Sequence, residues 1–191
     1  MANKYLRCDI SNMKETNIGG RLYSAQTDKV VANGYIGYLG DYLNGSTEVR
    51  KLLAPTAELI ETGTPVIVMR PEINYDESKE RNKAFGIFRN EANRPVPTIP
   101  FHEFDGVDLS TDYFKKDSGA IAIGDIFELQ SKDLTEEDVQ LSYVASPTAS
   151  GHKGYFKVIG IKDSHQAIYL AGDGKMFPEP YKMIKLAYVL N

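Results

Sequence analysis

Three histidines are the side chains of this sequence best suited to acid–base chemistry or metal binding: His102, His152 and His165. No two of them stand three or four residues apart, and the chain has a single cysteine, so the spacing of a dedicated zinc site is missing. Asp163, Ser164 and His165 are adjacent, but a nucleophilic triad is assembled across a fold, and neighbours on a strand point to opposite faces. A turn between two strands is the better interpretation of these three residues.

Three further segments resemble ligand-binding or modification motifs without fulfilling them. The segment 171–175 (AGDGK) echoes a phosphate loop, but it lacks the spacing between glycines and the Ser or Thr after Lys, and its Asp-Gly pair is typical of a hairpin turn. Asp105, Asp108 and Asp112 could gather around calcium, yet their spacing differs from that of the helix-loop-helix calcium loop. The glycosylation sequon at 44–46 is interpreted as a turn. The sequence therefore predicts no catalytic residue, no cofactor, no metal and no enzyme.

The elements that would have to position any site are short β-strands. From residue 120 onward, apolar stretches are bounded by Gly, Pro, Asp or Ser at the spacing of a sandwich or barrel. The strands expected there cover 127–129, 139–145, 155–161, 167–171 and 181–190. Earlier in the sequence we expect strands over 30–39, 48–53 and 64–69, and a helical turn over 56–61. The predicted fold class is mainly β, with one or more small barrel or sandwich cores, few short helices and an extended N-terminal arm.

The stretch 181–190 is apolar on both faces. Ile184, Leu186 and Tyr188 share one face, whereas Met183 and Ala187 share the other with further apolar residues and one lysine. Both faces therefore require cover. The outer face is covered either by a loop or helix of the same chain or by another chain, because large apolar patches are rarely exposed.

Proline placement suggests how the chain is divided. Prolines at 95, 97 and 100 favour an extended connection, so we expect a Pro-containing connection over 93–118. Residues 1–25 would form the N-terminal arm, 26–92 a β-rich subdomain and 119–191 a β-barrel-like subdomain. The alternative is one domain over 26–191 with a long surface excursion.

Composition limits the partners and the compartment. The formal net charge is −4 with both signs interspersed, so the broad positive field of a nucleic-acid-binding protein is missing. No stretch approaches the roughly 18 apolar residues of a membrane span. The single cysteine, Cys8, excludes an internal disulfide, which fits a reducing cytosol or a particle assembled there. We expect no nucleic-acid partner and no membrane partner.

Three stretches of the sequence resemble small proteins from the head gene region of tailed bacteriophages that infect Gram-positive bacteria: NKYLRCDISNMKETNIGGRLYSA, GTPVIVMRPEINYDE and YKMIKLAYVLN. These proteins have the character of capsid decoration or auxiliary head proteins. The resemblance implies an accessory virion protein that is assembled in the host cytoplasm, binds the major capsid protein at repeated sites on the head exterior and stabilises the shell. It leaves open whether the chain also forms a homo-oligomer.

Two other functions remain open from the residues alone. Twelve tyrosines and the loop 101–114 fit a β module that binds a carbohydrate or another small ligand. A hydrolase that uses His102 or His165 with nearby carboxylates is the third hypothesis. For the docking hypothesis, the expected interface residues are Tyr5, Arg7, Ile10, Met13, Tyr181, Met183 and Tyr188.

Overall fold

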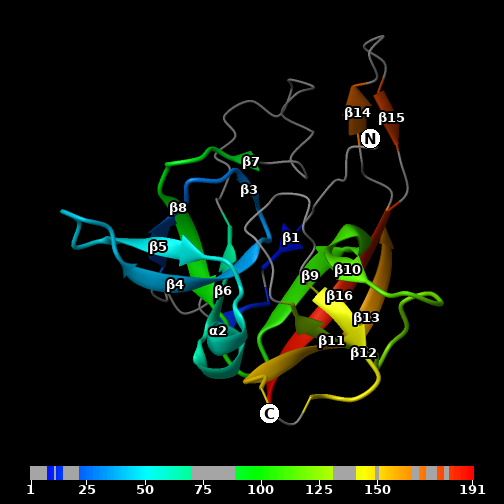
Figure 1. Cartoon of the computed structure of the whole chain (residues 1–191). Coiled ribbons are helices and arrows are strands. Elements are labelled where there is room, and N and C mark those ends of the chain that lie inside the picture. The colour runs from blue at the N-terminus through cyan, green and yellow to red at the C-terminus, as the bar shows by residue number, and fades with distance from the viewer. Residues whose placement is uncertain are drawn as a thin grey trace.

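The structure, a computed structural model, is mainly β, as predicted. It describes residues 8–10, 12–14, 22–69, 89–130, 141–148, 151–164, 168–170, 176–178 and 181–191. Two sheets dominate it, a closed ring of five strands and an open sheet of seven strands (Figure 1). Within the described residues, no helix is both long and apolar enough to cross a membrane.

The ring is built from the first half of the chain. Its strands, in spatial order, are β2 (Tyr23–Gln26), β5 (Val49–Leu53), β4 (Ile36–Tyr42), β6 (Pro65–Val68) and β8 (Val96–Pro100). All four residues of β6 are buried, as expected for 64–69. The predicted helical turn is α2 (Ala57–Thr62), which begins after Thr56, whose hydroxyl accepts a hydrogen bond from the amide of Leu59 at 3.3 Å.

The seven-stranded sheet contains most of the second half of the chain. Its strands, in spatial order, are β1 (Cys8–Asp9), β9 (Gly106–Ser110), β16 (Tyr181–Leu190), β13 (Gly154–Ser164), β11 (Ile126–Leu129), β12 (Leu141–Val144) and β10 (Phe114–Lys115). The longest pairing joins β13 and β16, from Gly154 opposite Leu190 to Ser164 opposite Tyr181. Four of the strands predicted after residue 120 are strands of this sheet.

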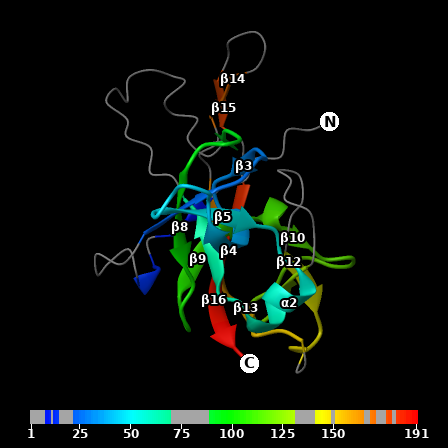
Figure 2. The ribbon, with the colours of Figure 1, turned by 60° about the vertical axis from the view of Figure 1, so that its left-hand side comes forward.

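Two short strand pairs and one short helix complete the described elements. They are β3 (Val31–Ala32) with β7 (Arg89–Asn90), β14 (Ile168–Leu170) with β15 (Met176–Pro178), and the 3-10 helix η3 (Thr111–Tyr113). The predicted strand over 167–171 is β14. The β14–β15 pair lies between β13 and β16 in sequence and stands away from the two sheets in both views (Figures 1 and 2).

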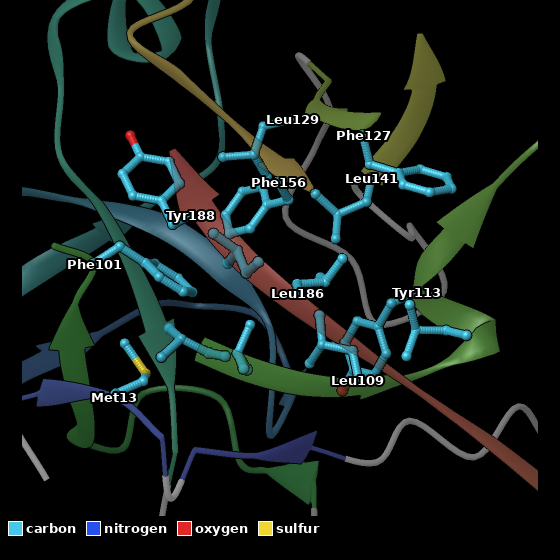
Figure 3. Packing of buried hydrophobic residues seen from close by; sticks show 14 of the residues in the cluster. Met13, Phe101, Leu109, Tyr113, Phe127, Leu129, Leu141, Phe156, Leu186 and Tyr188 are labelled. Atoms are coloured by element: carbon cyan, nitrogen blue, oxygen red, sulfur yellow. The ribbon is translucent and has the colours of Figure 1, made fainter. Parts of the chain in front are cut away.

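One hydrophobic core joins the ring to the seven-stranded sheet. Ile36 and Tyr38 of the ring belong to the same buried cluster as residues of β9, β11, β13 and β16. Aromatic side chains meet in this cluster (Figure 3). The centroids of the Phe101 and Phe156 aromatic rings lie 5.2 Å apart, with an angle of 81° between the ring planes, and the centroids of Phe156 and Tyr188 lie 5.1 Å apart. Such edge and tilted contacts are the favoured geometries of aromatic pairs. The five-stranded ring and the seven-stranded sheet therefore pack against each other through this common cluster of side chains.

The segment 93–118, expected as a connection, contributes strands to both sheets. It contains β8, which closes the ring, and β9, which pairs with both β1 and β16. The described part of the expected arm also belongs to the body. Cys8 and Asp9 pair with β9, Met13 is fully buried in the shared core, and 23–26 form β2. The arm thus docks on its own chain where the structure describes it.

The two faces of β16 differ in burial. Ile184, Leu186 and Tyr188, which share one face, are buried in the shared core. The opposite face, with Met183 and Ala187 among its residues, is half-buried. The inner face is therefore the core face, and the outer face keeps part of its apolar surface in contact with solvent.

Candidate docking surface

The most prominent surface feature is the two-stranded ribbon formed by β14 and β15. In this ribbon Ile168 is opposite Pro178, Tyr169 opposite Phe177 and Leu170 opposite Met176. All six residues are of apolar or aromatic type. Among the described residues, β14 and β15 have only each other as strand partners. A two-stranded ribbon alone is marginally stable in water.

The sequence motif AGDGK lies between these two strands. Its flanks, β14 and β15, are paired antiparallel, which is the arrangement that the hairpin interpretation of the motif requires. The motif itself, at 171–175, and His165 lie outside the described residues.

Exposed isoleucines lie on and beside β13, the strand that precedes the ribbon in sequence. Ile159 and Ile161 of β13 are 46% and 36% exposed, and a register shift between Val158 and Gly160 interrupts the pairing of this strand with β16. Ile123 is 70% exposed in the turn before β11, and the amide of the next residue, Gly124, donates to the carbonyl of Val158 at 2.9 Å. We call β14, β15 and the side chains of Ile123, Ile159 and Ile161 the ribbon surface.

Backbone pairing near the base is incomplete on one side. β11 pairs with β13 only at Phe156 and Lys157, so in the described part of the chain the 159–164 portion of β13 has β16 as its only strand partner. Lys182 Nζ and Asp163 Oδ1 lie 3.8 Å apart there, with both side chains mostly exposed. An exposed ion pair of this kind contributes little to stability. The apolar residues are therefore the features of this region best suited to binding.

Charged residues cluster on the outer face of the seven-stranded sheet. Asp9 is opposite Asp108, and Asp108 is opposite Lys185 on the next strand. Burial raises the pKa of Asp108, Lys185 and Lys162 oppose this shift, and the charge of Asp9 adds to it. Asp108 Oδ1 is buried and accepts no hydrogen bond from the described residues. The two aspartates therefore repel each other where the arm pairs with β9.

A buried carboxylate fastens the arm to the body. Asp105 has no exposed surface; its Oδ1 accepts from the amide of Lys14 at 2.9 Å, and its Oδ2 accepts from the amide of His102 at 2.7 Å. His102 Nδ1 lies 3.5 Å from the same Oδ2. The Lys14 side chain adds a hydrogen bond to the carbonyl of Glu103 at 2.6 Å. His102 and Asp105, which sequence reasoning placed in separate hypotheses, thus shape one turn that holds the arm.

A second buried carboxylate, Glu128, belongs to β11. Glu128 is 1% exposed and accepts from the amide and the hydroxyl of Thr148 at 2.7 and 2.9 Å. His152 Nδ1 lies 3.5 Å from Glu128 Oε2, and Asn191 Nδ2 donates to the carbonyls of both Thr148 and His152. The hydroxyl donates to the carboxylate and not to the imidazole, so the hydrogen bonding is not that of a nucleophile activated by a base. The cluster ties the 145–153 segment to β11.

Two further candidates for chemistry were the aspartates proposed to bind calcium and the thiol of Cys8. Asp105 is in the core, whereas Asp108 is on the outer face of β9, so they do not form one oxygen site. Among the described residues, no three or more His, Cys, Asp or Glu side chains form a group that could hold a metal. Burial, with the charges of Asp9 and Asp108, raises the pKa of the Cys8 thiol well above its usual value. Such a thiol is a poor nucleophile, because the thiolate is the reactive form.

The residues expected at an interface divide into four groups. Met13 and Tyr188 are buried in the shared core, so their side chains are not available to a partner, and these two are corrected to core residues. Ile10 packs partly buried against the same core, and Met183 is half-buried on the outer face of β16. Tyr181 begins β16 opposite Ser164, at the base of the ribbon. Tyr5 and Arg7 lie outside the described residues.

Sequence reasoning did not select the residues of the ribbon surface. A sequence signal for these residues was present, because the apolar segments IYL and MFP flank the Asp-Gly motif with no alternation of polar and apolar residues.

No protein-family model, curated protein sequence or solved structure matches this chain.

Proposed function

We propose that this chain is a structural protein that docks on an assembled protein lattice, as a capsid decoration or auxiliary head protein of a tailed bacteriophage. The observation that carries the proposal is the ribbon surface, which combines the exposed isoleucines of β13 and of the turn before β11 with the apolar residue types of the projecting β14–β15 pair. Its partner in this function is the major capsid protein, and its place is the head exterior of the virion.

Burial of apolar area is the physical basis of such docking. Each square ångström of apolar surface removed from water contributes about 25 cal/mol, so a ribbon seated between capsid subunits would gain several kcal/mol. A ligand that binds the assembled shell and not its separated subunits stabilises the shell by mass action. A lattice offers the same site many times, so even modest affinity per site protects the whole particle.

The rest of the fold supports this role by keeping the body rigid. The described arm is fastened through Asp105, and the ring and the seven-stranded sheet share one core. A body that is already ordered loses less entropy on binding than one that must fold on its partner. The resemblance of the sequence to phage head-region proteins points to the same class of partner.

Sedimentation with undecorated capsids tests the proposal directly. The purified chain is expected to pellet with capsids, to saturate at a fixed number of copies per particle and to resist moderate salt, because apolar contacts are weakly screened. A Tyr169→Ser, Phe177→Ser double variant should lose this binding. Leu22→Ser is the matched control, because Leu22 is an exposed apolar residue beside the ring and not in the ribbon surface.

Two results would reject the proposal. One is a wild-type chain that stays in the supernatant at all capsid concentrations while its melting transition shows that it is folded. The other is the absence of this chain from purified virions in a mass-spectrometric search. If the ribbon variant binds as well as the wild type, docking uses another surface, and the ribbon assignment fails.

A further inference from the structure

Two Asn-Gly pairs occur in this sequence, Asn33-Gly34 and Asn44-Gly45. Such a pair is suited to a spontaneous reaction in which the amide nitrogen of the glycine attacks the side-chain carbonyl carbon of the asparagine, because glycine has no Cβ to obstruct the approach. The reaction requires an accessible asparagine side chain and a glycine amide that is not held in a hydrogen bond. The two pairs differ in both respects.

The second pair lies at the tip of the connection between β4 and β5. The amide of Ser46 donates to the carbonyl of Leu43 at 2.9 Å, so Asn44 and Gly45 are the central residues of a β-turn, as expected for 44–46. Both residues are exposed, and neither the Asn44 side chain nor the Gly45 amide bonds to a described residue. A Cβ at Gly45 would meet no atom within 4 Å. The nitrogen and the carbon that would react are therefore open to water.

The ends of this connection are fastened, whereas its tip is not. The amide of Leu43 donates to the carbonyl of Val49 at 2.9 Å, and Ser46 Oγ accepts from the amides of Glu48 and Val49 at 3.2 and 2.8 Å. In the described part of the chain, only the hydrogen bond from Ser46 to Leu43 spans the tip. The tip can therefore rearrange for the attack while β4 and β5 stay paired in the ring.

The first pair is held by hydrogen bonds on both residues. Asn33 is 8% exposed, its Oδ1 accepts from Nδ2 of Asn90 at 3.1 Å, and its carbonyl accepts from the hydroxyl of Tyr113. The amide of Gly34 donates to the carbonyl of Val68 at 2.7 Å. This nitrogen cannot reach the Asn33 side chain unless these contacts break. The fold therefore protects the first pair and leaves the second unprotected.

We propose that Asn44 is a site of spontaneous deamidation in the folded protein. The amide of Gly45 loses its proton to hydroxide, and its nitrogen forms a bond to Cγ of Asn44. The bond from Cγ to the side-chain nitrogen breaks, and this nitrogen leaves as ammonia with a proton taken from water. A second water then opens the succinimide ring at either of its two carbonyls. The product at position 44 is aspartate or isoaspartate, and water is the only co-reactant.

Either product changes the tip of the connection. Both add a negative charge near the exposed carboxylates of Asp41 and Glu48, and isoaspartate also lengthens the main chain of the turn by one carbon atom. The proposal goes beyond docking, because Asn44 belongs to the ring and lies well apart from the β14–β15 ribbon (Figure 1). The reaction cannot be reversed by water, so the fraction of altered turns measures the age of the protein.

Peptide mapping by mass spectrometry tests the proposal on the full chain, aged in native buffer at pH 7 and pH 9. The peptide that contains Asn44 should change from amide to acid at least about tenfold faster than the peptide that contains Asn33, because Asn33 reacts only when its surroundings open. The rate should rise with pH, since the Gly45 amide must lose its proton. Isoaspartate should accompany aspartate, because direct hydrolysis of the side chain gives aspartate alone.

Two controls accompany this measurement. Asn44→Gln should remain unchanged at position 44, because the longer side chain must close a larger ring that forms more slowly. In urea that unfolds the chain, Asn33 should react at a rate close to that of Asn44, which would show that the fold supplies its protection.

Three results would overturn the proposal. They are equal rates at Asn33 and Asn44 in native buffer, aspartate at position 44 without isoaspartate, and no reaction at Asn44 in native buffer when the unfolded chain does react there. The measurement uses no capsids, so its failure and the failure of the docking proposal are distinguishable.

Discussion

The amide of Lys14 donates a 2.9 Å hydrogen bond to Asp105 Oδ1, across 91 positions of sequence. The acceptor belongs to a carboxylate with no exposed surface, whose other oxygen is bonded to the amide of His102. One side chain therefore joins the arm, the turn before β9 and the core.

Asp105→Ala should strongly destabilise the fold. It leaves the amides of Lys14 and His102 without their acceptor, and hydrogen bonds to a charged group contribute about 1.5–3 kcal/mol each, so the free energy of unfolding should fall by about 3 kcal/mol or more. Urea denaturation measures the loss. Asp163→Ala is the control, since that exposed carboxylate lies 3.8 Å from Lys182 Nζ and should matter by less than about 0.5 kcal/mol. Equal effects of the two variants would contradict the role of Asp105.

Gly34→Ala should destabilise the protein more than Gly45→Ala. Both glycines have positive φ, +86° and +79°, where a side chain costs about 1–2 kcal/mol. A Cβ at Gly34 would also lie 2.8 Å from Cζ of Tyr113 and 2.9 Å from Cβ of Cys8, whereas a Cβ at Gly45 meets no atom within 4 Å. Thermal unfolding of the two variants compares them, and the difference isolates the crowding under the arm. Similar melting temperatures would show that the arm does not pack closely at Gly34.

Phe156→Ala should weaken both sheets together. The Phe156 side chain packs against Phe101 and Tyr188, in the cluster that also contains Tyr38 of the five-stranded ring. Its removal should lower the free energy of unfolding by about 3–5 kcal/mol, in a single transition. The chain has no tryptophan, so Tyr42→Trp and Tyr143→Trp supply one fluorescent probe for each sheet. Both probes should report the same lowered denaturation midpoint. Two separate midpoints would instead support independent subdomains.

Asp108→Asn should stabilise the protein more at neutral pH than in acid. The pKa of Asp108 is raised in the folded state, chiefly by burial, so this carboxyl favours folding fully only below its unfolded pKa, and that contribution is lost as the pH rises through the folded pKa. The asparagine lacks this pH-dependent loss. Urea midpoints of both proteins at pH 3 and pH 7 should show the advantage of the variant growing with pH. The same difference between the two urea midpoints at pH 3 and at pH 7 would contradict this role of Asp108.

Local patterns were sufficient for most elements of the fold. The strands over 181–190 and 155–161 were recognisable because apolar residues alternate or run between Gly, Pro and Asp. β6 was recognisable as an apolar run after Gly63, and a helical turn was expected after Pro55. These features depend on residues close together in the sequence, so they can be predicted from the sequence alone.

Features that depend on distant contacts were not accessible in the same way. Pro97 and Pro100 suggested a connection, yet they lie in β8, where Pro97 is opposite Ser24 and its carbonyl accepts from the amide of Met69. Tertiary pairing here outweighs the local preference of proline.

The position of β16 between β9 and β13 bears on the timing of folding. During synthesis, every strand of the five-stranded ring has been translated by residue 100, whereas β16, an interior strand of the other sheet, is translated after both of its neighbours. On the ribosome, β9 and β13 therefore lack their common strand partner until Leu190 has emerged. Until then their apolar inner faces are accessible to chaperones.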